Sequence, residues 1–254
     1  MKVTFLGTGT SSGVPMIACD CEVCQSSDRK DKRLRCSIIV ETDIGNNIVV
    51  DIGPDFRQQM LKENVNDISA VLITHCHRDH TAGLDDIRAF NFKLKKDISI
   101  YTDRHTEDEI KQQFAYIFAK SPYPGLPKIN LINFKDDPFT VEGDEIIPIK
   151  TLHHKLPVYG FRLGNFTYIT DANYISDEAI QKIKGSKVFV INALRKDKHV
   201  SHFTLEEALE IIEKVEPEQA YLTHLSHQMG LHDEVSKELP PNVSIAYDGL
   251  QITI

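Results

Sequence analysis

The sequence lacks the features of several broad protein classes. Its 254 residues contain no apolar run close to the roughly 20 residues that a membrane-spanning helix needs. We therefore expect neither a signal peptide nor a membrane anchor, and no membrane partner. No linker-like segment, low-complexity stretch or internal repeat interrupts the chain, which predicts one continuous domain over residues 1–254.

An excess of basic residues is also missing. The chain has 37 acidic and 29 basic residues, a formal net charge of -8, which disfavours contact with nucleic-acid phosphates. The densest basic stretch, residues 29–35, is interrupted by Asp31 and has no aromatic residue nearby for base stacking. We interpret it as a solvated surface loop and expect no nucleic-acid partner.

The cysteines are few, and their number is odd. Three of the five fall within six residues, at Cys19, Cys21 and Cys24. An odd count and such crowding suit a reducing compartment and a metal better than a disulfide framework, which is the alternative. This pattern predicts a cytoplasmic protein.

Apolar periodicity and turn residues predict alternating strands and helices, hence an α/β or α+β fold. Residues 204–207 have the form of a capping box, which starts a helix that Pro217 stops. The proline-rich residues 121–127 predict a loop. Strands are expected at residues 3–6, 37–42, 47–51, 71–73, 146–152, 160–163, 168–170, 188–191 and 220–223, and helices around 54–61, 84–90, 110–118, 176–183 and 204–216.

Metal-ligand side chains are densest directly after the strand expected at 71–73. His75 and His77 are two residues apart, so an extended chain can present both to one ion while Cys76 faces elsewhere. Asp79 and His80 follow as the chain turns. Imidazole with carboxylate suits zinc, manganese or iron, and this many ligands can hold two adjacent ions. A polar surface turn is the alternative interpretation.

The run His-x-His-x-Asp-His after a strand resembles the hallmark of the metallo-β-lactamase superfamily. The resemblance implies an α+β fold of four αββα layers, with two packed sheets flanked by helices. Asp51, Asp171 and His224, each at a predicted strand end, match further motif positions of that family, and His153 matches another, with His154 as second choice. The implied ligands of two divalent ions are His75, His77, Asp79, His80, His153, Asp171 and His224.

A narrower resemblance is to the cyclic phosphodiesterases of the carbon-phosphorus lyase pathway. It rests on the glycine-rich residues 7–15, the cysteine cluster and residues 222–228. It implies a structural zinc held by Cys19, Cys21, Cys24 and His227. Three thiolates and an imidazole complete a tetrahedral zinc shell with no open position for substrate. The remaining cysteines, at 36 and 76, are expected to be free thiols.

Three features near the expected site are less specific. His202 matches a family histidine that protonates the leaving oxygen, although a structural role at the helix entry is an equal alternative. Arg195 could clamp a phosphate or lie solvated on the surface. Residues 105–131 match the narrow family least, so a loop over the pocket and a plain surface loop both stay open.

Together these patterns predict a metal-dependent phosphodiesterase that hydrolyses a small, cyclic phosphodiester. Asp79, Asp171 and His202 are the expected catalytic residues, and two manganese, zinc or iron ions are expected to activate the attacking hydroxide. Alternatives are a thioester or lactone hydrolase, a tRNA 3′-end nuclease, which the acidic charge argues against, and a non-catalytic metal-dependent binding module. A homodimer is left open.

Overall fold

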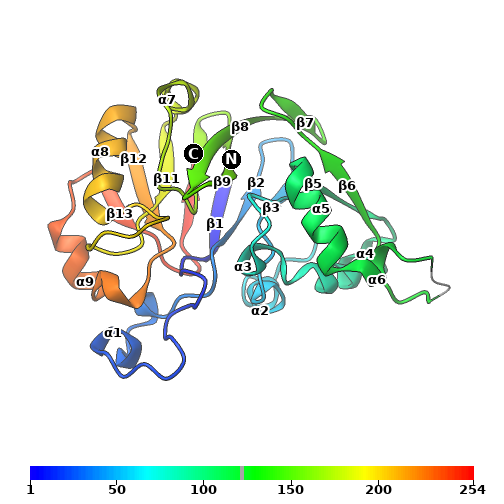
Figure 1. Cartoon of the computed structure of the whole chain (residues 1–254), viewed down its shortest axis with the longest axis horizontal. Coiled ribbons are helices and arrows are strands. Elements are labelled where there is room, and N and C mark those ends of the chain that lie inside the picture. The colour runs from blue at the N-terminus through cyan, green and yellow to red at the C-terminus, as the bar shows by residue number, and fades with distance from the viewer. Residues whose placement is uncertain (121–122) are drawn as a thin grey trace.

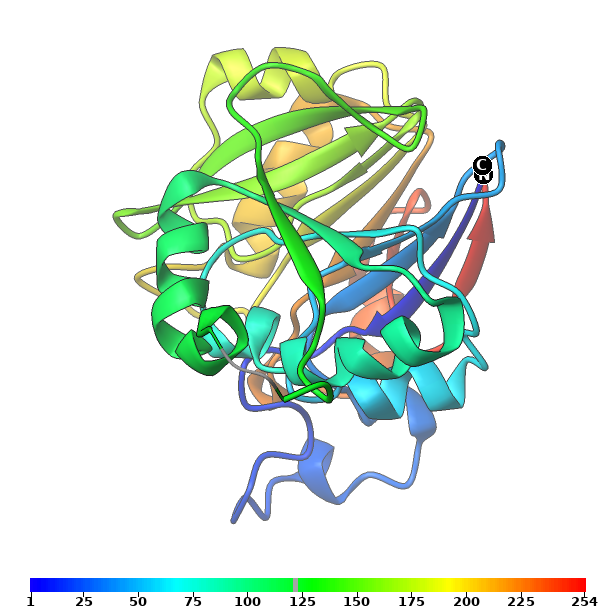
Figure 2. The ribbon, with the colours of Figure 1, turned by 90° about the vertical axis from the view of Figure 1, so that its right-hand side faces the viewer.

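Two mixed β-sheets of seven strands each lie face to face in the computed structural model, which describes residues 1–120 and 123–254. Helices cover the outer face of each sheet (Figures 1 and 2). These layers confirm the predicted αββα fold. In strand order, the first sheet contains β14 (Gln251–Thr253), β1 (Lys2–Gly7), β2 (Ser37–Glu41), β3 (Asn47–Val50), β4 (Ala70–Leu72), β5 (Ile98–Thr102) and β6 (Ile129–Asn133).

The second sheet has the same number of strands, and its parallel part runs from β10 to β13. In order it contains β13 (Val243–Ile245), β12 (Gln219–Thr223), β11 (Val188–Asn192), β10 (Phe166–Tyr168), β9 (Leu156–Leu163), β8 (Asp144–His153) and β7 (Phe139–Val141). The helices are α1 (Glu22–Gln25), α2 (Phe56–Lys62), α3 (Arg78–Thr81), α4 (Ile87–Leu94), α5 (Arg104–Gln113), α6 (Ala115–Phe118), α7 (Asp177–Ile183), α8 (Leu205–Val215) and α9 (His232–Val235).

Three apolar clusters hold the layers together. Phe5, Phe161 and Tyr168 belong to the cluster between the sheets and are fully buried. A second cluster packs α7 and α8 on the second sheet, and a third packs α2, α4 and α5 on the first. Both faces of the central strands are therefore covered, which explains near-continuous apolar runs such as the one in β2.

Parallel strands bring several chain segments to one edge of the molecule. β3 and β4 run parallel, as do β10, β11 and β12, so residues after their carboxyl ends can converge. Asp51, Asp171 and His224 follow β3, β10 and β12 and have φ angles of 64°, 55° and 57°. This left-handed conformation is uncommon for residues other than glycine, and at three ligand-type positions it indicates a built site.

The α8 capping box is confirmed. Thr204 Oγ1 accepts a hydrogen bond from the Glu207 amide at 3.1 Å, and the Glu207 carboxylate accepts one from the Thr204 amide at 2.9 Å. The helix ends at Val215, two residues before the predicted stop at Pro217, and Glu216 adopts a left-handed cap.

Other elements differ from the sequence-based expectation. β5, β6, β7, β13 and β14 were not expected, and three of them have only three residues, which is too short to show alternation. The helix expected at 110–118 is two helices, because Phe114 leaves the helical conformation with a φ of -116° and a ψ of 38°. Of the predicted proline-rich loop, residues 121–122 lie outside the described residues. Among the described residues, no helix is both long and apolar enough to span a bilayer.

Candidate metal centre

The predicted ligand run lies where β4 ends. His75 is 1% exposed, and its Nε2 lies 3.0 Å from Nδ1 of the exposed His77. Asp79 and His80 follow in the short helix α3. Cys76 does not join them, since its Sγ lies 3.8 Å from Nε2 of His105.

Asp51 orients His80 from beneath the run. One carboxylate oxygen of Asp51 lies 2.7 Å from His80 Nδ1, and the other accepts a hydrogen bond from the Thr74 amide at 2.9 Å. Holding Nδ1 in this way aims Nε2 of His80 at the centre of the site. Sequence reasoning missed Thr74, whose hydroxyl bonds both Asp51 and Nδ1 of His75.

Asp171 is the carboxylate shared by the whole cluster. Its Oδ2 lies 3.2 Å from Nε2 of His80 and 3.1 Å from Nδ1 of His224. Asp171 belongs to each of three groups whose ligand atoms lie within 4.8 Å of one another. The groups are His75 with His80 and Asp171, His153 with Asp171 and His202, and Asp79 with Asp171 and His224.

Not every expected ligand lies in such a group. His77 contacts His75, and its ring centroid lies 5.1 Å from that of His153, but it joins none of the three groups. The sequence left His153 and His154 as alternative ligands, and the structure places His153 in the cluster. His154 is exposed and has a φ of 57°.

The donor set fits divalent cations. Nε2 of His80 and Nε2 of His224 are buried without a hydrogen-bond partner, although His80 Nε2 lies 3.2 Å from oxygens of both Asp79 and Asp171. Buried polar nitrogens are rarely left unpaired in proteins. Imidazole nitrogens and carboxylate oxygens directed at one another are the ligands that a pair of zinc, manganese or iron ions takes.

The charge of the cluster also favours cations. Burial lowers the pKa of His75 well below its usual value, so that this imidazole is neutral. Burial acts in the same direction on His224, but the carboxylate of Asp171 outweighs it and raises the pKa to about 10. In His80, burial is likewise outweighed by Asp171, Asp51 and Asp79, and the pKa rises well above normal. The carboxylates thus draw positive charge into the site, which protons or metal ions can supply.

His202 lies inside the cluster rather than at its margin. Its Nδ1 is 4.0 Å from Asp171 and has no hydrogen-bond partner, and its ring centroid is 4.6 Å from that of His153. Burial, followed by the charge on His224, lowers its pKa to about 3. This environment suits a group that holds an ion or contacts substrate, and it does not resemble a plain helix-entry residue.

The cysteine cluster forms a second, separate group. The sulfur atoms of Cys19 and Cys21 lie 3.3 and 3.2 Å from Nδ1 of His227, and Cys24 is within 4.8 Å of all three. The hydrogen bond with His227 lowers the pKa of Cys21 to about 6, which favours the thiolate that binds metal. No disulfide joins the five cysteines, all of which lie in the described part of the chain.

The segments around the cluster are packed by close backbone approach. A Cβ at Gly53 would lie 1.9 Å from the carbonyl oxygen of Asp79, and one at Gly7 would lie 2.0 Å from that of Arg35. These two positions therefore require glycine because any side chain would collide with the neighbouring backbone. The guanidinium of Arg195 donates hydrogen bonds to Gln228 Oε1 at 2.6 Å and to two backbone carbonyls of its own loop. These bonds stabilise the loop and leave no pair of parallel N–H groups free to bind a phosphate.

Fold and cluster define a class, the metal-dependent hydrolases with an αββα architecture, and comparison with known proteins agrees. Residues 46–225 match the beta-lactamase superfamily domain. The chain belongs to the metallo-β-lactamase superfamily.

Individual relatives carry different activities. A solved diphosphatase of the PhnP family is 36% identical, with a TM-score of 0.93, and the match covers 100% of this chain and 97% of that one. An octanoyltransferase of Porphyromonas gingivalis is 40% identical over 256 residues, covering 100% of this chain and 52% of the relative. A ribonuclease Z of Prochlorococcus marinus is 29% identical over 171 residues, covering 65% of this chain and 49% of the relative. The chain therefore spans about half the length of these curated relatives.

Proposed function

We propose that this chain is a metal-dependent phosphodiesterase for a small, cyclic phosphodiester. The observation that carries the proposal is the cluster around Asp171, with buried, unpaired imidazole nitrogens, in a chain similar over its whole length to a PhnP-family diphosphatase. Diphosphate and phosphodiester hydrolysis both break a P–O bond after attack at phosphorus. One pair of ions can serve either reaction.

Each residue of the cluster has a separate task in this proposal. Seven residues lie in the three groups, and all of them except His202 are proposed metal ligands. The exposed His77 completes the proposed shell. When bound, two divalent ions supply an activated water and neutralise charge on the phosphate oxygens. Asp51 keeps His80 in one orientation, and Asp171 spans both halves of the site.

We assign His202 to the leaving oxygen. Burial lowers its pKa to about 3 without substrate, and the negative charge of a phosphodiester bound beside the ring would raise that pKa, so that the imidazole can carry the proton it donates. It lies opposite Asp171, is 8% exposed, and has a buried ring nitrogen without a partner, so a substrate oxygen can take that position. Proton transfer to a departing alkoxide is typically worth a factor of about 10² to 10⁴ in rate.

The proposed substrate is a small molecule and not a nucleic acid. The net charge of -8 disfavours binding of a long polyanion, and the guanidinium of Arg195 is already bonded to Gln228. The proposed location is the cytoplasm, because five free cysteines, three of them in one cluster, suit a reducing compartment.

A second candidate is hydrolysis of an acyl thioester. The specific observation in its favour is the 40% identity to an octanoyltransferase, a protein named for acyl transfer, although this chain covers only 52% of it. The same cluster could polarise a thioester carbonyl.

One panel of assays separates the candidates. The protein is loaded with manganese, zinc or iron and offered a ribose 1,2-cyclic phosphate, a nucleoside 2′,3′-cyclic phosphate, a nucleoside diphosphate, a precursor tRNA and an octanoyl thioester. We expect the cyclic diesters to be turned over fastest and the reaction to stop on chelation. Preference for the thioester or for the tRNA would overturn the proposal, as would no turnover by fully metallated protein.

A further inference from the structure

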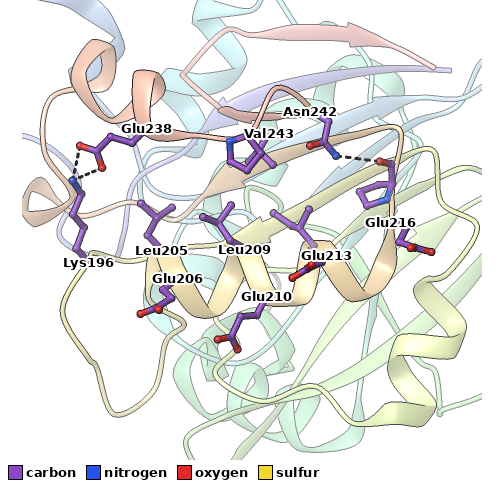
Figure 3. Close-up of a pocket in the computed structure, with 13 residues that line it drawn as sticks. Lys196, Leu205, Glu206, Leu209, Glu210, Glu213, Glu216, Glu238, Asn242 and Val243 are labelled. Carbon is purple, nitrogen blue, oxygen red and sulfur yellow. Dashed lines mark hydrogen bonds and ion pairs between the residues drawn. The ribbon is translucent and has the colours of Figure 1, made fainter.

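A groove lies along α8, on the outer face of the second sheet and apart from the metal cluster. Its volume is about 910 Å³, and it separates α8 from residues 238–243. Figure 3 shows Leu205 and Leu209 pointing from the helix towards the side where Val243 lies. With Ile212 they form an apolar floor at the i, i+4, i+7 spacing of one helix face.

The rim of the groove is acidic. Glu206, Glu210 and Glu213 repeat the same spacing one residue further along α8, and Glu216 extends this acidic stripe. All four are exposed, and none of their carboxylates has a hydrogen bond or ion pair among the described residues. Among the described residues that line the groove, the one cation is Lys196, which is paired with Glu238 at 2.6 Å. Lys184 and Lys214 line a neighbouring hollow with Glu213 and Glu216 and form no ion pair with them. Like charges placed on one helix face repel one another and destabilise it, which a bound cationic partner would relieve.

We propose that the groove docks a basic amphipathic helix of another protein. The apolar floor would take the apolar face of that helix, and the acidic stripe would pair with lysine or arginine on its flank. α8 has 11 residues, or about 16 Å of length, which matches roughly three turns of a bound helix.

A second copy of this chain fits the groove less well. One basic, apolar surface among the described residues is the hollow with Phe92, Lys95, Lys96 and Lys128, and Phe92 is 57% exposed. That surface lies on the α4 layer, across both sheets from α8 (Figure 1). Contact between these two surfaces is head-to-tail on opposite sides of the molecule, which builds open chains rather than a closed dimer.

The probe is a fluorescein-labelled synthetic peptide of about 18 residues with leucine on one helical face and lysine on its flanks. Its controls are the same peptide with glutamate in place of lysine and a scrambled peptide of identical composition. Anisotropy titrations with the full chain should show binding of the basic peptide alone, weakening as salt is raised. Hydrogen exchange should slow in residues 205–216 and 238–243 on binding.

The variant that tests the acidic stripe is Glu206→Gln with Glu210→Gln and Glu213→Gln. Since these carboxylates have no partners in the fold and repel one another, the variant should melt at the same temperature as the unaltered protein or slightly higher, and should lose about tenfold in peptide affinity. The matched control removes the same charge from exposed glutamates elsewhere, with Glu41→Gln, Glu142→Gln and Glu145→Gln, and should bind normally. Leu209→Arg tests the floor and should abolish binding.

Several results would overturn the proposal. One is equal binding of the basic, acidic and scrambled peptides, and another is equal loss in the two triple-glutamine variants. A third is concentration-dependent self-association in sedimentation equilibrium that Leu209→Arg removes, because it would assign the groove to a second copy. None of these measurements depends on hydrolytic activity, so they stand apart from the test of the proposed function.

Discussion

The two ligand clusters of this chain are built in opposite ways. The His/Asp cluster collects side chains from positions as far apart as His75 and His224, and most of them are buried. The Cys/His cluster takes three of its four members from one short segment, residues 19–24, which runs into α1, and Cys19 and Cys21 are only half-buried. A site assembled from many strand ends requires the whole fold, whereas a loop site can hold its own segment in place.

From this difference we propose that the His/Asp cluster carries the chemistry and that the Cys/His cluster contributes stability. The His/Asp cluster has buried nitrogens without partners and carboxylates that draw in positive charge, as a catalytic centre needs. The Cys/His cluster has a ligand set that closes a tetrahedral zinc shell. His227 lies three residues after His224, so the second cluster also anchors the segment that carries a member of the first.

The largest expected effect comes from removing a carboxylate or imidazole from the catalytic cluster. Asp79→Ala or His80→Ala should lower hydrolysis by about a thousandfold or more, because the site loses an ion and its activated water. Elemental analysis and turnover should be measured on the same preparation. Asp67→Ala, which removes an exposed carboxylate before β4, is the matched control and should behave as the unaltered protein. Full activity in a metal-depleted Asp79 variant would contradict a two-metal site.

His202→Ala tests whether a residue in the cluster acts on the leaving oxygen. Hydrolysis of esters with poor leaving groups should fall by about a hundredfold, whereas activated aryl esters, which need no proton, should slow far less. Metal content should stay unchanged. Equal slowing of both ester types together with metal loss would show that His202 is a ligand, as its position with His153 and Asp171 allows.

Asp51→Asn should have a smaller effect, because Asp51 acts through His80. The amide can still bond Thr74 but holds His80 less firmly, so metal affinity should fall about 10- to 100-fold. Titration with manganese at several concentrations should restore most of the activity. If saturating metal restores none, Asp51 does more than orient its neighbour.

The sequence was most informative where ligands are contiguous. The run from His75 to His80 is readable because its members are close together and follow a strong apolar strand. Asp51, Asp171 and His224 are single residues at strand ends, where a cap or turn role is more common than a ligand role, so resemblance alone selected them. Their left-handed φ angles depend on tertiary packing that no local pattern encodes.

Other parts of the site were not readable because they depend on contacts across the fold. Thr74 was passed over, since a threonine before a histidine has no signal until Asp51 is placed beneath it. Gly53 resembles an ordinary turn glycine until the approach of the Asp79 carbonyl shows why a side chain does not fit. The helix-forming pattern of α8 was read correctly, but the groove beside it requires residues 238–243, which come from a later segment.

The smallest expected effect on catalysis, and the clearest on stability, comes from Cys21→Ser. A structural zinc contributes its binding free energy to folding, so the variant should lose zinc and melt about 10 °C lower, corresponding to about 3 kcal/mol in a chain of this size. Activity at low temperature should fall far less than in the Asp79 variant, because no residue of the His/Asp cluster changes. Cys76→Ser is the control: its half-buried sulfur lies beside His105 and outside the zinc ligands, so zinc content and melting temperature should not change. Retained zinc and an unaltered melting temperature in Cys21→Ser would show that the Cys/His cluster does not hold a structural zinc. A loss of activity as large as that in Asp79→Ala would instead show that the two clusters form one functional unit.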